Sequence, residues 1–157
     1  MDISIRIPLY RIDGSIRAHV RISESDSHYI SRFSWSISGK YAKRHVNGSS
    51  VKMHRDIMNC PDGMEVDHIN GDPLDNRRSN LRICTISQNR MNHRIPKNNA
   101  VGVCGVSRSG RRYRAYISPG DCRRAVFRRF KTIEEAIQWR REAEILYHRE
   151  FRWRPDR

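Results

Sequence analysis

The first third of the chain alternates apolar and polar residues in short runs. Residues 3–9 and 16–22 alternate with a period of two, and Asp13-Gly14 between them is a common hairpin turn. Three more apolar segments are ambiguous between strand and helix: 29–37, 41–46 and 51–58. The pattern predicts a small β-rich part over residues 1–50.

The centre of the chain predicts a strand, a long loop, a second strand and a short helix. Residues 65–69 and 81–84 have the composition of strands, and the Asn-Gly-Asp-Pro run at 70–73 favours a turn or loop. Thr85, followed three residues later by Gln88, forms a capping-box pattern that starts a helix. Pro96 ends this helix because the residue before proline is disfavoured in helical geometry.

The last third predicts three strands and one helix. Strand-like segments at 101–106, 112–117 and 124–130 are separated by short turns rich in glycine and serine. Thr132 and Glu135 form another capping box, and apolar residues at helical spacing continue to about His148. We therefore expect a three-stranded antiparallel sheet with one packed helix.

Taken together, these elements predict an α+β protein with four parts. They are a β-rich part at 1–50, a strand-strand-helix segment at 51–96, a polar linker at 97–100 and the sheet-and-helix module at 101–157.

Charge indicates a polyanionic partner. The chain has 31 Lys+Arg and 17 Asp+Glu, a formal net charge of +14, and an excess of this kind most often indicates nucleic acid. Residues 54–100 carry only +1, whereas the flanks on either side carry +5 and +8. A site that gathers carboxylates around a metal would dilute positive charge locally in this way.

The sequence argues against a membrane or secreted protein. It contains no run of about 20 apolar residues and does not open with a basic-then-apolar signal segment. We therefore expect a soluble cytoplasmic protein with no membrane partner. The four cysteines form no CxxC pair, so we expect them to be small core residues and not zinc ligands.

Four polar residues of the centre suit the cutting of a phosphodiester bond. Asp67 and His68 stand at the end of the first strand, where a carboxylate can hold a metal while an imidazole reaches an adjacent water. Asn89 falls in the first turn of the following helix and could supply a second hard ligand. Asn80, which opens the second strand, could hydrogen-bond backbone and fix the orientation of the histidine.

These residues stand in a recognisable arrangement. Val-Asp-His-Ile-Asn-Gly at 66–71, Asp-Asn-Arg-Arg-Ser-Asn-Leu-Arg at 75–82 and Gln-Asn at 88–89 resemble the HNH motif of phage and intron homing endonucleases, in its H-N-N variant. The resemblance implies a ββα-metal fold in which Asp67 and Asn89 bind one divalent ion, His68 is the general base and Asn80 braces the loop. It also implies products with a 5′ phosphate and a 3′ hydroxyl.

Two other histidines are weaker candidates. His93 lies four residues after Asn89 on the same predicted helical face, so it is an outside candidate for a metal ligand. We expect His54 to pack or to contact phosphate. Because the expected ligands are Asp and Asn oxygens, Mg²⁺ or Mn²⁺ is the favoured ion over a soft transition metal.

The C-terminal module carries a second resemblance. The residues at 102–107, 112–117 and 130–136 resemble the Apetala-type (ethylene-responsive) DNA-binding domain, although the tryptophan usual on the first strand is missing. In that family a three-stranded sheet backed by a helix enters the major groove. Carried over by position, the DNA-facing residues are Arg108, Arg112, Arg114, Tyr116, Arg124 and Arg128.

The favoured interpretation is a phage or bacterial enzyme that nicks or cuts double-stranded DNA, with a homodimer as one way to cut both strands. The alternative is a catalytically inactive, sequence-specific DNA-binding protein that keeps an HNH scaffold. A basic RNA-binding protein fits the charge but leaves the spacing of Asp67, His68, Asn80 and Asn89 unexplained.

Overall fold

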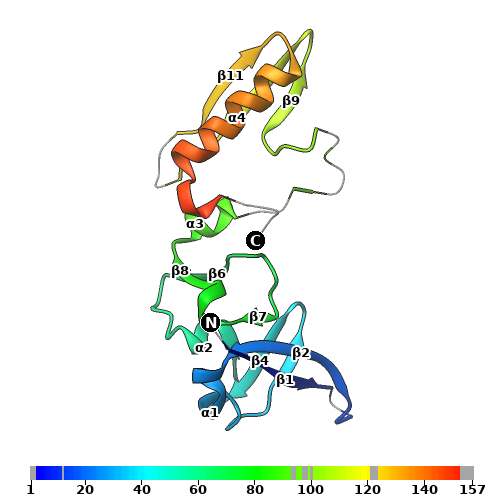
Figure 1. Cartoon of the computed structure of the whole chain (residues 1–157), viewed down its shortest axis with the longest axis vertical. Helices are drawn as coiled ribbons and strands as arrows, with labels where there is room; N and C mark the ends of the chain where they lie inside the picture. The colour runs from blue at the N-terminus through cyan, green and yellow to red at the C-terminus, as the bar shows by residue number, and fades with distance from the viewer. Residues whose placement is uncertain are drawn as a thin grey trace. The chain divides into compact units, whose positions relative to one another are not determined.

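The computed structural model describes residues 3–11, 13–92, 95–96, 99, 101–120 and 124–152. The chain forms two compact units, one up to Ile86 and one from Ser87 onward, and each is described by itself (Figure 1). Most of the predicted linker at 97–100 lies outside the described residues.

A six-stranded sheet dominates the first unit. Its strands, in chain order, are β1 (Ser4–Tyr10), β2 (Ile16–Ser23), β3 (Ser36–Ser38), β4 (Tyr41–Val46), β5 (Ser49–Lys52) and β7 (Asp75–Asn76). Their order across the sheet is β5-β4-β3-β1-β2-β7, with β1 parallel to β3 and β2 parallel to β7. The predicted hairpin of β1 and β2 is confirmed, and Gly14 has the positive φ of 81° that its turn requires.

Short helical segments connect these strands. They are η1 (Glu24–Asp26), α1 (Ser27–Ile30), α2 (Met53–Ile57) and η2 (Arg78–Asn80). The ambiguous segment at 29–37 contains the end of α1 and most of β3, and the segment at 51–58 contains the end of β5 and all of α2. Each of these two segments therefore contains both a strand and a helix.

A two-stranded ribbon of β6 (Glu65–His68) and β8 (Leu81–Cys84) carries the central motif. Both strands were predicted, and both are confirmed. Helix α3 (Ile86–Met91) begins directly after Thr85, as predicted, but it ends at Met91 and does not extend to Pro96. The long loop between β6 and β8 contains β7, which the sequence analysis did not predict.

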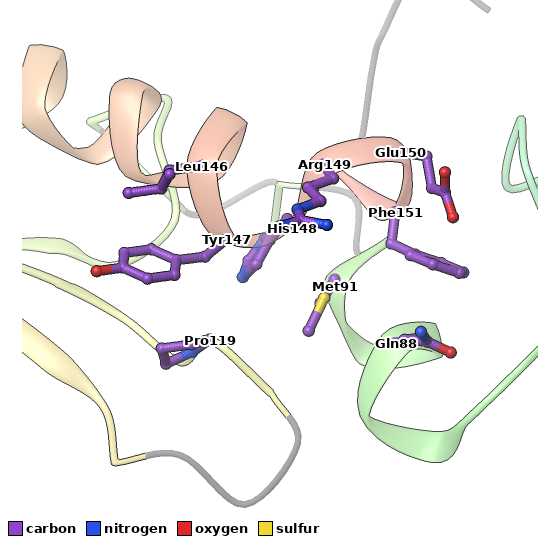
Figure 2. A pocket seen from close by; sticks show the side chains of 9 residues that line it. All are labelled: Gln88, Met91, Pro119, Leu146, Tyr147, His148, Arg149, Glu150 and Phe151. Carbon is purple, nitrogen blue, oxygen red and sulfur yellow. The ribbon is translucent and has the colours of Figure 1, made fainter.

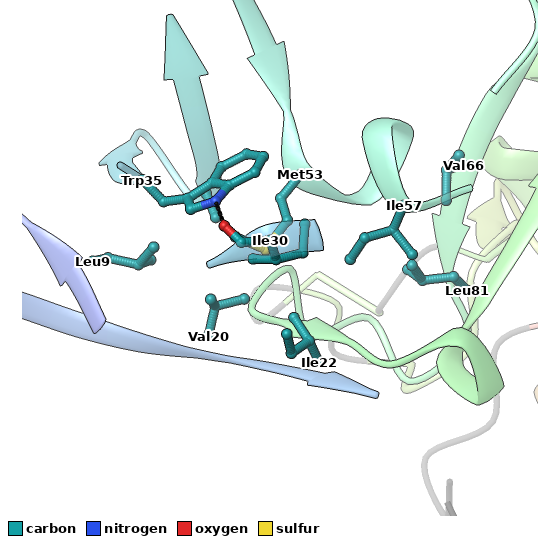
Figure 3. Packing of buried hydrophobic residues seen from close by; sticks show 10 residues of the cluster. Leu9, Val20, Ile22, Ile30, Trp35, Met53, Ile57, Val66 and Leu81 are labelled. Atoms are coloured by element: carbon teal, nitrogen blue, oxygen red, sulfur yellow. Dashed lines mark hydrogen bonds between the residues drawn. The ribbon is translucent and has the colours of Figure 1, made fainter. Parts of the chain in front are cut away.

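One apolar core holds the first unit together. Leu9, Val20 and Ile22 of the hairpin pack with Met53 of α2 and with Leu81 of β8 (Figure 3). The indole nitrogen of Trp35 donates to the carbonyl oxygen of Ile30 at 2.9 Å, so this buried polar group keeps a partner. Residues on both sides of position 50 therefore share one core, and this core positions the β6–β8 ribbon.

The second unit contains a three-stranded antiparallel sheet covered by one helix. Its elements are β9 (Val106–Ser109), β10 (Arg112–Ile117), β11 (Val126–Phe130), α4 (Ile133–Tyr147) and η3 (Arg149–Phe151). The sheet order is β11-β10-β9, and α4 packs on one face. Thr132 and Glu135 form the predicted capping box, because the Thr132 hydroxyl accepts from the Glu135 backbone while the Glu135 side chain accepts from the Thr132 backbone.

The predicted strand at 101–106 is wrong. Gly102 and Gly105 adopt positive φ values of 70° and 78°, which interrupt an extended strand, and β9 begins only at Val106. The α+β class and the C-terminal sheet with its packed helix are confirmed. Within the described part of the chain, no helix has both the length and the apolar character needed to cross a membrane.

Two isoleucines on β2 allow a matched test of this core. Ile22 is fully buried, whereas Ile16 on the same strand is 53% exposed. We expect Ile22→Ala to lower the free energy of unfolding by about 2–5 kcal/mol, because it leaves a cavity in a close-packed core. Ile16→Ala should change it by about 0.5 kcal/mol or less. Urea denaturation measures both values, and equal losses would contradict the assigned core.

Candidate active site

Asp67 and His68 are the last two residues of β6. Neighbouring side chains on a strand point to opposite faces, so Asp67 and His68 contact different residues. His68 lies opposite Leu81 across the ribbon, and Asp67 lies opposite Arg82. The ribbon therefore directs the imidazole and the carboxylate toward different partners.

The His68 imidazole is held on three sides. Its Nε2 lies 2.7 Å from Asn76 Oδ1, its ring stacks on Tyr41 at 6.1 Å between centroids, and the ring of His54 meets it edge-on at 4.9 Å. Only 7% of His68 is exposed. An amide oxygen can only accept a hydrogen bond, so with the Asn76 amide in this orientation the bond requires the tautomer with the proton on Nε2 and the lone pair on Nδ1.

Burial also sets the protonation state of His68. Removing the ring from water lowers the pKa of His68 below its usual 6.5, while the hydrogen bond to Asn76 and the charges of nearby carboxylates act in the opposite direction. The net effect is a lowered pKa, so the imidazole is neutral at pH 7. A neutral imidazole is the form that can accept a proton.

Asn80 closes the loop that follows His68. Its side-chain nitrogen donates to the backbone oxygen of Asp75 at 2.8 Å and to Asn70 Oδ1 at 3.0 Å. Its side-chain oxygen accepts from the backbone N–H of Asn70 at 3.0 Å, and its backbone oxygen accepts from Ile69. Through these hydrogen bonds Asn80 connects Asn70, near the start of the loop, with Asp75 in its middle.

Asp75 fixes the far side of the same loop. The carboxylate is fully buried and forms ion pairs with Arg77 at 2.7 Å and Arg21 at 3.1 Å, while Asn70 Nδ2 donates to it. Burial alone would raise the pKa of Asp75, but these partners outweigh it and hold the pKa below its usual value. These contacts make Asp75 a structural carboxylate.

The proposed metal donors are placed as follows. Asp67 is buried at the end of β6, and Arg82 Nη2 lies 2.6 Å from its Oδ2. Asn89 belongs to α3, in the part assigned to the second unit, and His93 lies outside the described residues. Within the described residues, no group of three or more His, Cys, Asp or Glu side chains is arranged to hold a metal.

Two neighbours of His68, Asn76 and Tyr41, were not singled out from the sequence. Asn76 sits in an Asp-Asn pair that reads as ordinary turn chemistry, and Tyr41 lies on a distant strand. His54 was expected to pack or to contact phosphate, and it is buried against His68 with no hydrogen-bond partner found for its Nδ1. No local pattern could have shown that these residues surround His68, because β7, β4 and α2 bring Asn76, Tyr41 and His54 to it only in the folded unit.

In the second unit, strand register decides which arginines share a face. Arg114 and Arg129 are cross-strand partners, and Arg112 lies on the same face as Arg114. Arg128 instead pairs with Ala115 on the side facing α4, where its guanidinium lies over the Trp139 ring. Of the other expected DNA-facing residues, Arg108 lies on the α4 side, Tyr116 lies on the open face with Arg112 and Arg114, and Arg124 is exposed just before β11.

A small cavity of about 230 Å³ lies within the second unit, between α3 and the end of α4 (Figure 2). Met91 and Gln88 of α3 and Phe151 of η3 lie on one side, and Tyr147 lies on the other. Its lining also includes His148 and Glu150, and His148 Nε2 lies 3.0 Å from the backbone oxygen of Ser118. We interpret this cavity as space left by imperfect packing between α3 and the end of α4.

The buried His54 predicts a pH-dependent stability. Burial, His68, Lys52 and Arg55 lower the pKa of His54 from 6.5 to about 3. The unfolded chain therefore binds a proton below pH 6.5 that the folded chain does not bind until about pH 3. Stability contributed by His54 is full above pH 6.5 and is lost as the pH falls toward 3.

The measurement is denaturant unfolding between pH 7.5 and 4.5. We expect the free energy of unfolding to fall on acidification more steeply for the wild type than for His54→Gln. The difference in slope should be up to ~1.4 kcal/mol per pH unit. His19→Gln, which changes an exposed histidine of β2, should keep the wild-type slope. Identical slopes for wild type and His54→Gln would show that His54 is not buried neutral.

Comparisons with known proteins give one family match and one similar phage protein. Residues 59–91 match the family model of an HNH endonuclease, and this range contains Asp67, His68, Asn76, Asn80 and Asn89. The chain is also similar to Protein 3.8 of Escherichia phage T7, with 40% identity over 52 residues, which is 33% of this chain and 43% of that protein. The match thus spans less than half of the phage relative. No solved structure matches the chain significantly. These findings support an HNH nuclease domain at residues 59–91.

Proposed function

We propose that this protein is a metal-dependent endonuclease of the HNH homing type that hydrolyses phosphodiester bonds in double-stranded DNA. The products would carry a 5′ phosphate and a 3′ hydroxyl. The observation that carries the proposal is the buried His68 held by Asn76 within the segment that matches the HNH family.

His68 is the proposed general base. Asn76 holds Nε2, so the basic Nδ1 is the atom that would take a proton from the attacking water. Tyr41 and His54 pack against the imidazole ring and restrict its rotation. The lowered pKa of His68 keeps the ring neutral and ready to accept a proton at pH 7. Base catalysis of this kind typically contributes about 10²–10⁴ in rate.

Asp67 and Asn89 are the proposed ligands of one divalent ion. Carboxylate and amide oxygens are hard donors, and this donor set fits Mg²⁺ or Mn²⁺. When bound, such an ion would neutralise charge on the scissile phosphate and stabilise the departing 3′ oxygen. Arg82 already pairs with Asp67 at 2.6 Å, so Arg82 and the ion would compete for this carboxylate. His93 stays an outside candidate for a further ligand.

Asn80 is the proposed brace of the site. Its contacts to Asn70 and to the Asp75 backbone hold the loop that leads from His68 to Asn76. Asn80 would therefore act on His68 indirectly, by placing Asn76. Loss of this brace should weaken catalysis without removing a chemical group from the reaction.

The C-terminal module is the proposed DNA-binding part, in keeping with its resemblance to Apetala-type domains. Exposed Arg112 and Arg114 on the sheet, with Arg124 just before β11, support contact with phosphates. Residues 101–157 carry a net charge of +8. This charge would attract DNA regardless of the position at which the nuclease site cuts it. A homodimer would allow two single cuts to become a double-strand break.

Two observations favour the alternative of an inactive DNA-binding protein with an HNH scaffold. Arg82 occupies the carboxylate of Asp67, and His68 is almost completely buried. Substrate or metal binding would have to displace Arg82 and admit water to His68. A measurement of DNA cleavage by the wild-type protein therefore distinguishes the endonuclease from the inactive DNA-binding protein.

Relaxation of supercoiled plasmid in Mg²⁺ or Mn²⁺ tests the enzyme directly. We expect wild-type protein to cut and His68→Ala to cut about 10²–10⁴ times more slowly, because the general base is lost. Asp67→Asn should raise the Mn²⁺ concentration needed for half-maximal cutting. His45→Ala, which truncates an exposed histidine of β4, is the matched control and should cut at the wild-type rate.

Measurements of DNA affinity and thermal melting on the same samples distinguish a loss of catalysis from a loss of folding or of DNA binding. A folded His68→Ala variant that binds DNA normally but cuts at the wild-type rate would remove His68 from the mechanism. A folded wild-type protein that binds DNA but cuts with neither metal would favour the inactive scaffold.

Binding should depend steeply on salt. If the basic module neutralises six to eight phosphates, DNA affinity should fall by roughly three to four decades between 50 and 200 mM salt, because condensed counterions are released on binding. Fluorescence anisotropy with a labelled duplex in EDTA measures the slope without cleavage. A nearly flat slope would exclude this module as an electrostatic DNA-binding surface.

A further inference from the structure

The three-stranded sheet of the second unit has one covered face and one open face. Ala115 and Ile117 of β10 are buried, and Val106 and Ala115 form a core with Ala136 of α4. The alternate residues of β10 point the other way and are exposed. Within the described part of this unit, α4 is the helix that packs extensively on the sheet, and it covers the face of Ala115.

Two aromatic rings lie side by side on the open face. Tyr116 of β10 and Phe127 of β11 are direct cross-strand partners, with exposed fractions of 47% and 57%. Side chains paired in this way have Cβ atoms about 4.5–5.5 Å apart. A phenylalanine more than half exposed beside a second exposed ring adds nothing to the core on the other face, so the pair is suited to contact with a ligand.

The surroundings of these rings are strongly basic. Arg112, Arg114 and Arg129 share the open face with them, and Arg114 lies with its guanidinium 5.1 Å from the centre of the Phe127 ring. Strands β9, β10 and β11 contain no acidic residue. The open face therefore combines flat apolar rings with positive charge, which is complementary to a polyanion that carries flat rings of its own.

We propose that the open face of this sheet binds single-stranded DNA by stacking unpaired bases on Tyr116 and Phe127. Arg112 and Arg129 hold the adjacent phosphates. This inference rests on the proposed function, since it takes DNA as the substrate and specifies which form of DNA the module holds. Sequence-tolerant binding of this kind combines a basic groove with aromatic rings on which successive bases stack.

Unpaired bases fit this face better than a duplex does. In a duplex both flat sides of each base are covered by its neighbours, and only base edges reach the grooves. Edges are recognised mainly by hydrogen-bonding side chains, and a ring such as Phe127 can contact only the methyl group of thymine there. A base released from its partner exposes a flat side that can lie against either ring. The open face would therefore engage DNA at a gap, a flap or a melted stretch.

Arg114 has a defined part in this arrangement. Its guanidinium lies over the Phe127 ring in the free protein, where it gains from the cation–π attraction. An arriving base can displace it, after which the planar guanidinium can pair with a phosphate or stack on the base in turn. Arg114 thus covers the Phe127 ring until DNA arrives.

The test uses the full chain in EDTA, with a labelled single strand of 15 deoxynucleotides and the duplex of the same sequence. We expect Tyr116→Ala and Phe127→Ala each to weaken single-strand binding by roughly fivefold to a hundredfold. Duplex binding should change by less than about threefold. Phe127→Trp should keep or improve single-strand affinity, because a larger ring stacks at least as well. Replacing one thymine by 5-iododeoxyuridine should give photocrosslinks to Tyr116 or Phe127.

Ile145→Ala and Leu146→Ala are the matched controls, since these apolar residues of α4 are 58% and 63% exposed but lie off the sheet. Both should bind as the wild type does. Equal losses for single strand and duplex in the ring variants, or no loss in either, would overturn the proposal, as would tighter binding of the RNA strand of the same sequence. Cleavage is scored separately, so an inactive nuclease with intact ring-dependent binding would refute only the proposed enzyme.

Discussion

The hydrogen bond between His68 and Asn76 connects the candidate chemistry to the fold. Asn76 is fully buried on β7, and β7 pairs with β2 in parallel, Ile22 opposite Asn76. The acceptor that orients the imidazole is therefore fixed by the main sheet of the unit. A change in the β2–β7 pairing would move Asn76 and release the ring.

Other residues of the loop between β6 and β8 also help to hold Asn76 in place. Asn80 fastens it from within, and buried Asp75 anchors it through Arg77 and Arg21. Loops are usually the mobile parts of a fold, yet here a long connection carries the groups that hold the reactive side chain. The dense polar network gives this loop the rigidity that a preorganised base needs.

The sequence predicted the ribbon strands at 65–69 and 81–84 well, because strand-like composition and the turn residues between them mark them locally. It placed Asp67, His68 and Asn80 close in the chain, and the register brings Asn80 beside the β6 end. It did not single out Asn76, since nothing local distinguishes a buried asparagine from one in an exposed turn, and it could not show that His54 packs on His68. Their importance arises only from the pairing of β7 with β2 and from the packing of α2.

The second unit shows the same division between local and long-range information. The capping box at Thr132 and Glu135 and the span of α4 were predictable from spacing alone. The choice of arginines was not, because Arg128 and Arg129 are adjacent and only the register with β10 says which one shares a face with Arg114. The exposure of Phe127 follows from the same register, which pairs it with Tyr116 on the open face.

The account depends most on a neutral His68 whose Nε2 donates to Asn76. Long-range ¹H–¹⁵N correlation spectra of ¹⁵N-histidine-labelled protein at pH 7 report the tautomer and charge of each ring. We expect His68 to be neutral with its proton on Nε2, and Asn76→Leu to abolish this preference. A charged imidazolium, or a proton on Nδ1 in the wild-type protein, would contradict the account.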